Sequence, residues 1–151
     1  MRHLEADIQE ACVRWFRYQY QQYALMLFAV PNGGSRNTKE AENLKRQGVL
    51  AGVSDLILLV GNGEYNALCV EMKQPTGKQT EKQIKWQKEA EKHKNRYVVC
   101  HSIEEFMDEA QTYLKNIDED KTKCPHCGKR HPLVAINGIC GKCDEQLWGK
   151  G

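Results

Sequence analysis

The sequence predicts an α/β fold, a mixed sheet flanked by helices, followed by a small zinc-binding unit at the C-terminal end. Two observations lead to this prediction. Segments with apolar residues at helical spacing alternate with short apolar runs over residues 4–114. Beyond them, four cysteines fall in two Cys-x-x-Cys pairs within residues 124–143. A chain of 151 residues is long enough for one ordinary domain and a small appendage.

The first elements are an amphipathic helix, a strand and a short helix. Residues 4–20 place apolar side chains at helical spacing, namely Leu4, Ile8, Ala11, Cys12 and Trp15. The apolar run ALMLFAV (24–30) ends at PNGG, which is typical of a strand followed by a turn. Thr38 then provides an N-cap for a short helix that Gly48 can end.

Two strands are predicted to pair as a hairpin in the middle of the chain. They are LILLV (56–60) and ALCVEM (67–72), and Gly-Asn-Gly between them supplies turn residues. Each run is short and apolar and is bounded by turn residues.

The remaining elements of the body are a helix, a strand and a helix. Residues 80–94 have helical spacing with Thr80 as the cap, and RYVVC (96–100) is a buried strand. Ser102 caps a last helix that runs to about Leu114. The polar stretch NIDEDKTK that follows marks a boundary. We expect a body domain at 1–117, a linker at 118–123 and the zinc ribbon at 124–151.

The charge of the chain differs between its parts. Residues 121–151 hold six Lys/Arg against two Asp/Glu, whereas residues 1–120 hold 16 against 18. A basic tail suits a polyanionic partner, although a solvated surface has the same composition. No run approaches the roughly 20 apolar residues of a membrane span, and the first residues, MRHLEADIQE, are too charged for a secretory signal. We therefore expect no membrane partner and a reducing cytoplasm.

Three charged residues, Asp55, Glu71 and Lys73, lie in or beside the predicted hairpin. Alternation along a strand places Glu71 and Lys73 on one face, and a hairpin centred on Gly63 places Asp55 opposite Glu71. Opposed Cβ atoms lie ~4.5–5.5 Å apart, where like charges repel. Two carboxylates with nearby carbonyl groups form an oxygen site for a hard divalent ion such as Mg²⁺, which can polarise water and neutralise charge on a phosphate.

Each of these residues also has an explanation that needs no site. Asp55 alone is typical of strand entry, and Glu71 and Lys73 alone are typical of the wet face of an edge strand. The combination of two facing carboxylates and an amine favours a site for phosphodiester hydrolysis.

The same residues resemble the PD-(D/E)xK nuclease signature, in which an aspartate, a strand and Glu71-Met72-Lys73 follow in order. Four longer motifs resemble, in order and spacing, the VRR-NUC family of virus-type replication and repair nucleases: PNGGSRN (31–37), GVLAGVSDL (48–56), EMKQPTGKQT (71–80) and EKQIKWQ (81–87). The resemblance covers about residues 4–115 and implies a restriction-endonuclease-like fold. One departure is Ser54, where the family usually has proline.

The resemblance implies roles for individual residues. Asp55 and Glu71 would be metal ligands together with the backbone carbonyl of Met72. Lys73 would position or activate the attacking water. Two further members of the implied catalytic set come from helices, Gln83 bordering the site and Glu5 completing the metal shell.

The helical pattern gives Gln83 separate support. It lies on one face with Gln79, Trp86 and Ala90, roughly opposite a row of lysines. An inward glutamine needs hydrogen-bond partners, which a neighbouring site supplies, although a glutamine at the rim of the face fits equally well. For Glu5 the alternative is a solvated first-turn charge that complements the helix dipole.

A contact with the DNA backbone is predicted for the segment NGGSRN. Asn32, Gly33, Gly34 and Arg36 offer exposed backbone N–H groups and one guanidinium group to a phosphate. A plain surface turn is the alternative. The lysine face of the helix over residues 80–94 is another candidate, but such a face is usually only solvated.

The cysteine cluster indicates a structural zinc ribbon. Two pairs, Cys124 with Cys127 and Cys140 with Cys143, flank a stretch that contains the hairpin dipeptide Asn-Gly. Disulfides are the alternative, and a reducing compartment argues against them. The neighbouring His126 and His131 are interpreted as bystanders, and the scattered Cys12, Cys69 and Cys100 as buried core residues.

These observations predict a DNA endonuclease that depends on Mg²⁺ or Mn²⁺. The resemblance implies structure-selective cleavage of branched or junction DNA in phage-type replication, recombination or repair, and makes a homodimer a geometric expectation. The alternative is a nucleic-acid-binding or adaptor protein that uses its zinc ribbon on an inactive nuclease-like body. The intact set of Asp55, Glu71 and Lys73 argues against that alternative.

Overall fold

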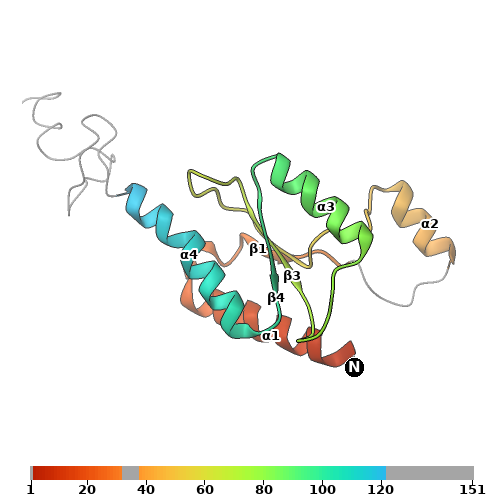
Figure 1. Cartoon of the computed structure of the whole chain (residues 1–151), viewed down its shortest axis with the longest axis horizontal. Helices are drawn as coiled ribbons and strands as arrows, with labels where there is room; N and C mark the ends of the chain where they lie inside the picture. The colour runs from red at the N-terminus through yellow and green to blue at the C-terminus, as the bar shows by residue number, and fades with distance from the viewer. Residues whose placement is uncertain (1, 32–37, 122–151) are drawn as a thin grey trace, which may run out of the picture. The chain divides into compact units, whose positions relative to one another are not determined.

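The computed structural model describes residues 2–31 and 38–121 of the chain. The elements follow in the predicted order, with one 3-10 turn added (Figure 1): α1 (Arg2–Gln19), η1 (Gln21–Tyr23), β1 (Leu27–Ala29), α2 (Thr38–Arg46), β2 (Leu56–Leu58), β3 (Leu68–Met72), α3 (Glu81–Lys92), β4 (Arg96–Cys100) and α4 (Ile103–Lys121). The chain divides into two compact units, residues 1–110 and 111–151, and the boundary falls inside α4. The first unit contains all four described strands.

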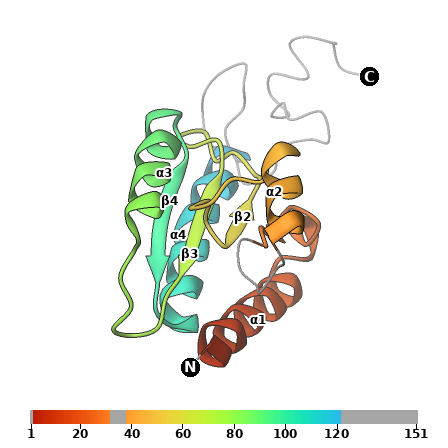
Figure 2. The ribbon, with the colours of Figure 1, turned by 90° about the vertical axis from the view of Figure 1, so that its right-hand side faces the viewer.

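The four strands form one mixed sheet in the order β1-β2-β3-β4. β1 with β2 and β2 with β3 pair antiparallel, whereas β3 and β4 run parallel. Parallel neighbours need a crossover connection, and α3 provides it (Figure 2). All five residues of β3 are buried, as expected for a strand with neighbours on both edges and helices over its faces.

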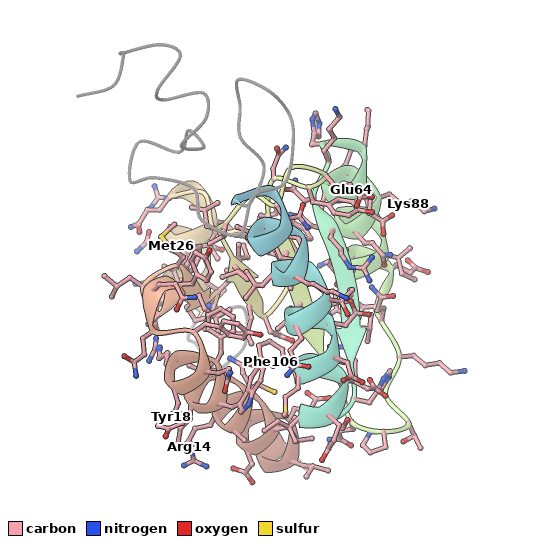
Figure 3. The ribbon with its side chains drawn as sticks, turned by 90° about the vertical axis from the view of Figure 1, so that its left-hand side faces the viewer. Arg14, Tyr18, Met26, Glu64, Lys88 and Phe106 are labelled. Carbon is pink, nitrogen blue, oxygen red and sulfur yellow. The ribbon has the colours of Figure 1, made fainter. Side chains whose placement is uncertain are left out.

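Helices lie on both sides of the sheet. α3 lies against β3 and β4 on one side, and α1 lies on the other (Figures 1 and 2). Phe106 of α4 points toward α1 (Figure 3), and its ring centroid lies 6.1 Å from that of Trp15 and 6.4 Å from that of Phe16. The mixed α/β fold predicted from the sequence is therefore confirmed.

The buried face of α1 differs in part from the prediction. Cys12 and Phe16 are fully buried, whereas Leu4 at the start of the predicted stripe is 48% exposed. The three scattered cysteines, Cys12, Cys69 and Cys100, are buried with free thiols, as predicted. No helix within the described ranges has both the length and the apolar composition to cross a lipid bilayer.

Element boundaries also differ, most of all in the first strand and the last helix. The first strand was expected over residues 24–30, but a turn closes through Met26, whose N–H donates to the Tyr23 carbonyl at 2.9 Å. The last helix continues to Lys121 instead of ending near Leu114. Residues 115–121 contain neither glycine nor proline, so no residue there stops the helix. Helix thus covers the first part of the predicted linker, and the domain boundaries themselves stay a prediction.

Gly52 allows the loop that precedes β2 to pack against the first turn of α3. Gly52 has φ +93°, and a Cβ added to it would lie 2.6 Å from the Lys82 carbonyl oxygen. A side chain is therefore excluded there both by backbone conformation and by contact. This close approach places the segment before Asp55 beside the helix that carries Gln83.

We expect Gly52→Ala to destabilise the protein by about 1–3 kcal/mol, because the loop must move away from α3. Gly48→Ala is the matched control: Gly48 has φ +99° but nothing within 4 Å of an added Cβ, so it carries the backbone strain alone. Chemical denaturation measures both variants. Equal losses of stability in Gly52→Ala and Gly48→Ala would show that the contact with Lys82 does not contribute.

Candidate active site

The hairpin register brings the two predicted carboxylates together. Leu56 pairs with Val70 at the end of the ladder, and continuing this register by one residue places Asp55 opposite Glu71, as the centre at Gly63 predicts. The Asp55 carboxylate accepts a hydrogen bond from the Met72 N–H at 2.8 Å, and its backbone carbonyl accepts one from the Val30 N–H at 2.8 Å. Both ends of Asp55 are therefore held by neighbouring strands.

Lys73 lies on the same side as Glu71, as the alternation predicts. Its Nζ lies 2.8 Å from Glu71 Oε1, with the two side chains 13% and 1% exposed. The Lys73 backbone N–H donates to the Cys100 carbonyl at 2.9 Å, which extends the pairing of β3 with β4 by one residue. The ion pair is thus formed by residues whose backbone is fixed at the end of the sheet.

Gln83 joins the site from the first turn of α3. Its side-chain carbonyl accepts a hydrogen bond from the Thr80 backbone N–H at 2.8 Å. Its backbone N–H donates to the Thr80 hydroxyl at 3.3 Å, which completes a capping box. Because its carbonyl is held by the cap, its amide nitrogen faces Glu71 and donates to Oε1. The Thr-x-x-Gln spacing of the capping box is visible in the sequence.

Glu5 reaches the site from α1. Its Oε1 accepts a hydrogen bond from the Gln74 N–H at 3.1 Å, just after β3. Its charge also contributes to raising the pKa of Asp55. The structure therefore places Glu5 beside the other acidic residues and gives its carboxylate a partner from another element.

A tyrosine that the sequence did not single out also contacts the site. The Tyr97 hydroxyl, from β4, lies 3.4 Å from Glu71 Oε2, and the residue is 7% exposed. In sequence it is one aromatic residue within a buried strand, and such residues usually belong only to the core. Its polar end, however, lies at the carboxylate.

The electrostatics of the cluster favour a cation. Burial raises the pKa of Asp55 and raises that of Glu71 to about 7, and the charge of Asp55 contributes to the second shift. Lys73 acts in the opposite direction on both. The carboxylates of Asp55 and Glu71 thus share one ammonium group, and the charge of Glu5 also acts on Asp55, so the ionised cluster has an excess of negative charge.

The donor set fits Mg²⁺ in composition. Over residues 2–31 and 38–121, no group of three or more His, Cys, Asp or Glu side chains is arranged to hold a metal ion. Mg²⁺ does not require such a cage, because it usually binds one or two carboxylates and takes its other ligands from water and substrate phosphates. Asp55 and Glu71 can supply those two carboxylates. Met72 contributes its N–H to Asp55, and the role of its carbonyl stays a prediction.

Two sets of predicted residues lie outside the described ranges. One is the predicted DNA-contacting set, Asn32, Gly33, Gly34 and Arg36. The other is the predicted zinc set, Cys124, Cys127, Cys140 and Cys143. Both stay predictions from the sequence.

Comparison with known proteins agrees with this fold. The VRR-NUC domain model matches residues 4–104, a range that includes all five side chains of the predicted catalytic set. A solved structure described as a VRR_NUC domain protein is 25% identical, with a TM-score of 0.65 over 74% of this chain and 88% of that one. No curated protein matches. Because the family model covers well over half of the sequence, the chain belongs to the VRR-NUC family.

Proposed function

We propose that this protein is a metal-dependent endonuclease that hydrolyses phosphodiester bonds in DNA. Membership of a family of nuclease domains supports the reaction class. The observation that carries the proposal is the meeting of Asp55, Glu71 and Lys73 at one end of the sheet, where an ion pair only 2.8 Å long sits beside a second carboxylate.

In this proposal Asp55 and Glu71 hold Mg²⁺ or Mn²⁺, and Glu5 adds negative charge to the shell. The bound ion would polarise a water molecule and neutralise charge that develops on the scissile phosphate. Lys73 positions the attacking water and donates hydrogen bonds to it or to a phosphate oxygen. Gln83, on α3, holds the Glu71 carboxylate in place through a hydrogen bond from its side-chain amide nitrogen.

The substrate we propose is branched or junction DNA, as in phage-type replication, recombination and repair, cut by a homodimer. The family resemblance of the sequence motifs supports this choice. Phosphate contacts would come from the segment of Asn32, Gly33, Gly34 and Arg36, which follows β1 in the sequence.

A substrate panel tests the proposed function. Purified protein is incubated with junction, flap, single-stranded and duplex DNA, each with Mg²⁺, with Mn²⁺ and with EDTA. We expect cleavage of branched DNA that EDTA abolishes. Binding of DNA without divalent-dependent cleavage of any substrate would instead favour the adaptor, for which the basic residues 121–151 provide a rationale.

The pKa of Glu71 leads to a pH prediction. Burial raises its folded-state pKa from the ordinary 4.5 to about 7, so in the metal-free protein this group stabilises the fold at low pH and loses that contribution as pH rises through 7. A cation must displace the proton, so its binding strengthens as pH rises.

We therefore expect the apparent dissociation constant for Mn²⁺ to be about tenfold higher at pH 6 than at pH 8. Isothermal titration calorimetry at pH 6, 7 and 8 measures it. A constant that does not change over this range would contradict the assignment of Glu71 as a ligand.

We also propose that residues 124–151 form a zinc ribbon with a closed four-cysteine site. Thiolates select Zn²⁺ over Mg²⁺, so the two metals would not compete. Replacing Cys124 and Cys127 by serine should remove the zinc from the purified protein, because two of the four thiolates are lost. Elemental analysis measures zinc per chain, and His131→Asn is the control that should retain it. Full zinc content in the double serine variant would contradict the site.

A further inference from the structure

A series of side-chain hydrogen bonds connects the surface of α3 to the candidate active site. Gln87 donates to Glu91 at 2.8 Å, and the amide nitrogen of Gln79 donates to Gln87 at 2.9 Å. The same nitrogen lies 3.3 Å from the Tyr97 hydroxyl, which in turn lies 3.4 Å from Glu71 Oε2. Four consecutive contacts thus lead from one carboxylate to another.

Each end of this series is a carboxylate, which when ionised only accepts hydrogen bonds. The direction of donation must therefore reverse once along the series. An amide NH₂ group has two N–H donors, and Gln79 uses its nitrogen toward both Gln87 and Tyr97. Gln79 is the point of reversal. The oxygen of Tyr97 accepts from Gln79, so its own hydrogen is directed to Glu71.

We propose that Tyr97 is a positioning residue, which fixes the orientation of the Glu71 carboxylate for metal binding, and that Gln79 sets the direction of the Tyr97 hydroxyl. The inference rests on the proposed function and deepens it, because it names two residues beyond the five of the implied catalytic set that prepare a metal ligand.

Contacts on both carboxylate oxygens support a positioning role. Oε1 of Glu71 faces Lys73 and Gln83, and Oε2 faces Tyr97. A carboxylate with donors on only one oxygen can rotate about its last bond, whereas donors on both restrict that rotation. Residues that orient a metal ligand in this way typically contribute a factor of 10–100 to metal affinity or activity.

The Tyr97 ring is itself held in place. Its centroid lies 5.9 Å from that of Trp86 on α3, and its backbone lies in β4 directly opposite Cys69 of β3. A tyrosine hydroxyl, with an ordinary pKa of about 10, keeps its proton at neutral pH and is available as a donor. A rigid aromatic residue therefore presents one donor to the carboxylate.

The experiment compares Tyr97→Phe with the unaltered protein in the full chain. We expect kcat for cleavage to fall about tenfold, KM for DNA to stay unchanged, and the dissociation constant for Mn²⁺ to rise by a similar factor. Mn²⁺ binding is measured by electron paramagnetic resonance, without DNA. Tyr18→Phe is the matched control, because Tyr18 on α1 is 80% exposed. A Tyr97→Phe variant with unchanged kcat and Mn²⁺ affinity would overturn the inference.

Gln79→Met tests the direction of the series. The substitution removes the amide group and keeps a side chain of similar size. We expect kcat to fall and the dissociation constant for Mn²⁺ to rise, each by less than in Tyr97→Phe. Since Gln79 is inferred to act through Tyr97, the double variant should be no more impaired than Tyr97→Phe alone. Strictly additive losses would show that Gln79 does not act through the hydroxyl.

The outcomes separate this inference from the proposed function. If the unaltered protein binds Mn²⁺ but cuts no DNA, and Tyr97→Phe weakens Mn²⁺ binding, the positioning role stands and the nuclease proposal fails. If the unaltered protein cuts DNA and Tyr97→Phe does so equally well with equal Mn²⁺ affinity, the reverse holds. Absence of Mn²⁺ binding by the unaltered protein would overturn both.

Discussion

Asp55→Asn is expected to lower divalent-dependent DNA cleavage by at least about 10³-fold, and Asp55→Ala to abolish it. The asparagine keeps the size of the side chain and an oxygen that can accept from the Met72 N–H, a contact of 2.8 Å in this structure. What it removes is the negative charge that a divalent cation needs. Steady-state cleavage of a junction substrate at saturating Mg²⁺ measures the loss.

Thermal stability gives a second test of Asp55→Asn, because the Tm should not fall although the activity does. Without metal, Asp55 is a half-buried carboxylate whose pKa is raised by desolvation, and it repels Glu71. Removing its charge relieves that repulsion, so the Tm of metal-free Asp55→Asn should equal or exceed that of the unaltered protein. Asp108→Asn, on the exposed side of α4, is the control and should change neither quantity. Cleavage at the normal rate by Asp55→Asn would refute its role as a ligand.

Lys73→Ala is expected to abolish cleavage for a different reason. Lys73 is 13% exposed and lies 2.8 Å from Glu71, so its ammonium group is available to a water or phosphate at the same place. Positioned proton-transfer and hydrogen-bonding groups of this kind contribute about 10²–10⁴-fold to rate. Lys73→Met keeps the aliphatic stem and should lose activity to a similar extent.

The affinity for Mn²⁺ distinguishes Lys73→Met from Asp55→Asn. Removing Lys73 takes a positive charge away from the carboxylates, so Mn²⁺ should bind Lys73→Met at least as tightly as it binds the unaltered protein, whereas Asp55→Asn should lose Mn²⁺ binding. Lys78→Met, five residues further along and exposed, is the control and should cut DNA normally. A Lys73→Met variant that retains normal kcat would show that the amine has no part in the reaction.

The central strands and their register were predictable from the sequence because they follow from local patterns. Side-chain alternation places Glu71 and Lys73 together, and the turn at Gly63 sets which residue of β2 opposes Glu71. These rules require only neighbours in the chain or across one turn. The same is true of the cap at Thr80, and the strand over residues 96–100 was predicted with its observed bounds.

Features that depend on distant segments were not predictable in the same way. The contact between Glu5 and Gln74 joins residues 69 positions apart, and the contact between Tyr97 and Glu71 joins residues 26 apart. Periodicity identifies which face of an element is buried, but it gives no information on which polar atom a buried side chain meets. For Leu4, periodicity predicts the wrong exposure. The residue fits the apolar stripe of α1, yet it lies near the helix start and is 48% exposed.

The most direct test of this account is a crystal structure of the protein with Mn²⁺, with data collected at the manganese absorption edge. The account predicts one anomalous peak between the carboxylates of Asp55 and Glu71, at distances of about 2.0–2.4 Å from an oxygen of each. An anomalous map without a peak at these two residues, in crystals that contain saturating Mn²⁺, would contradict it.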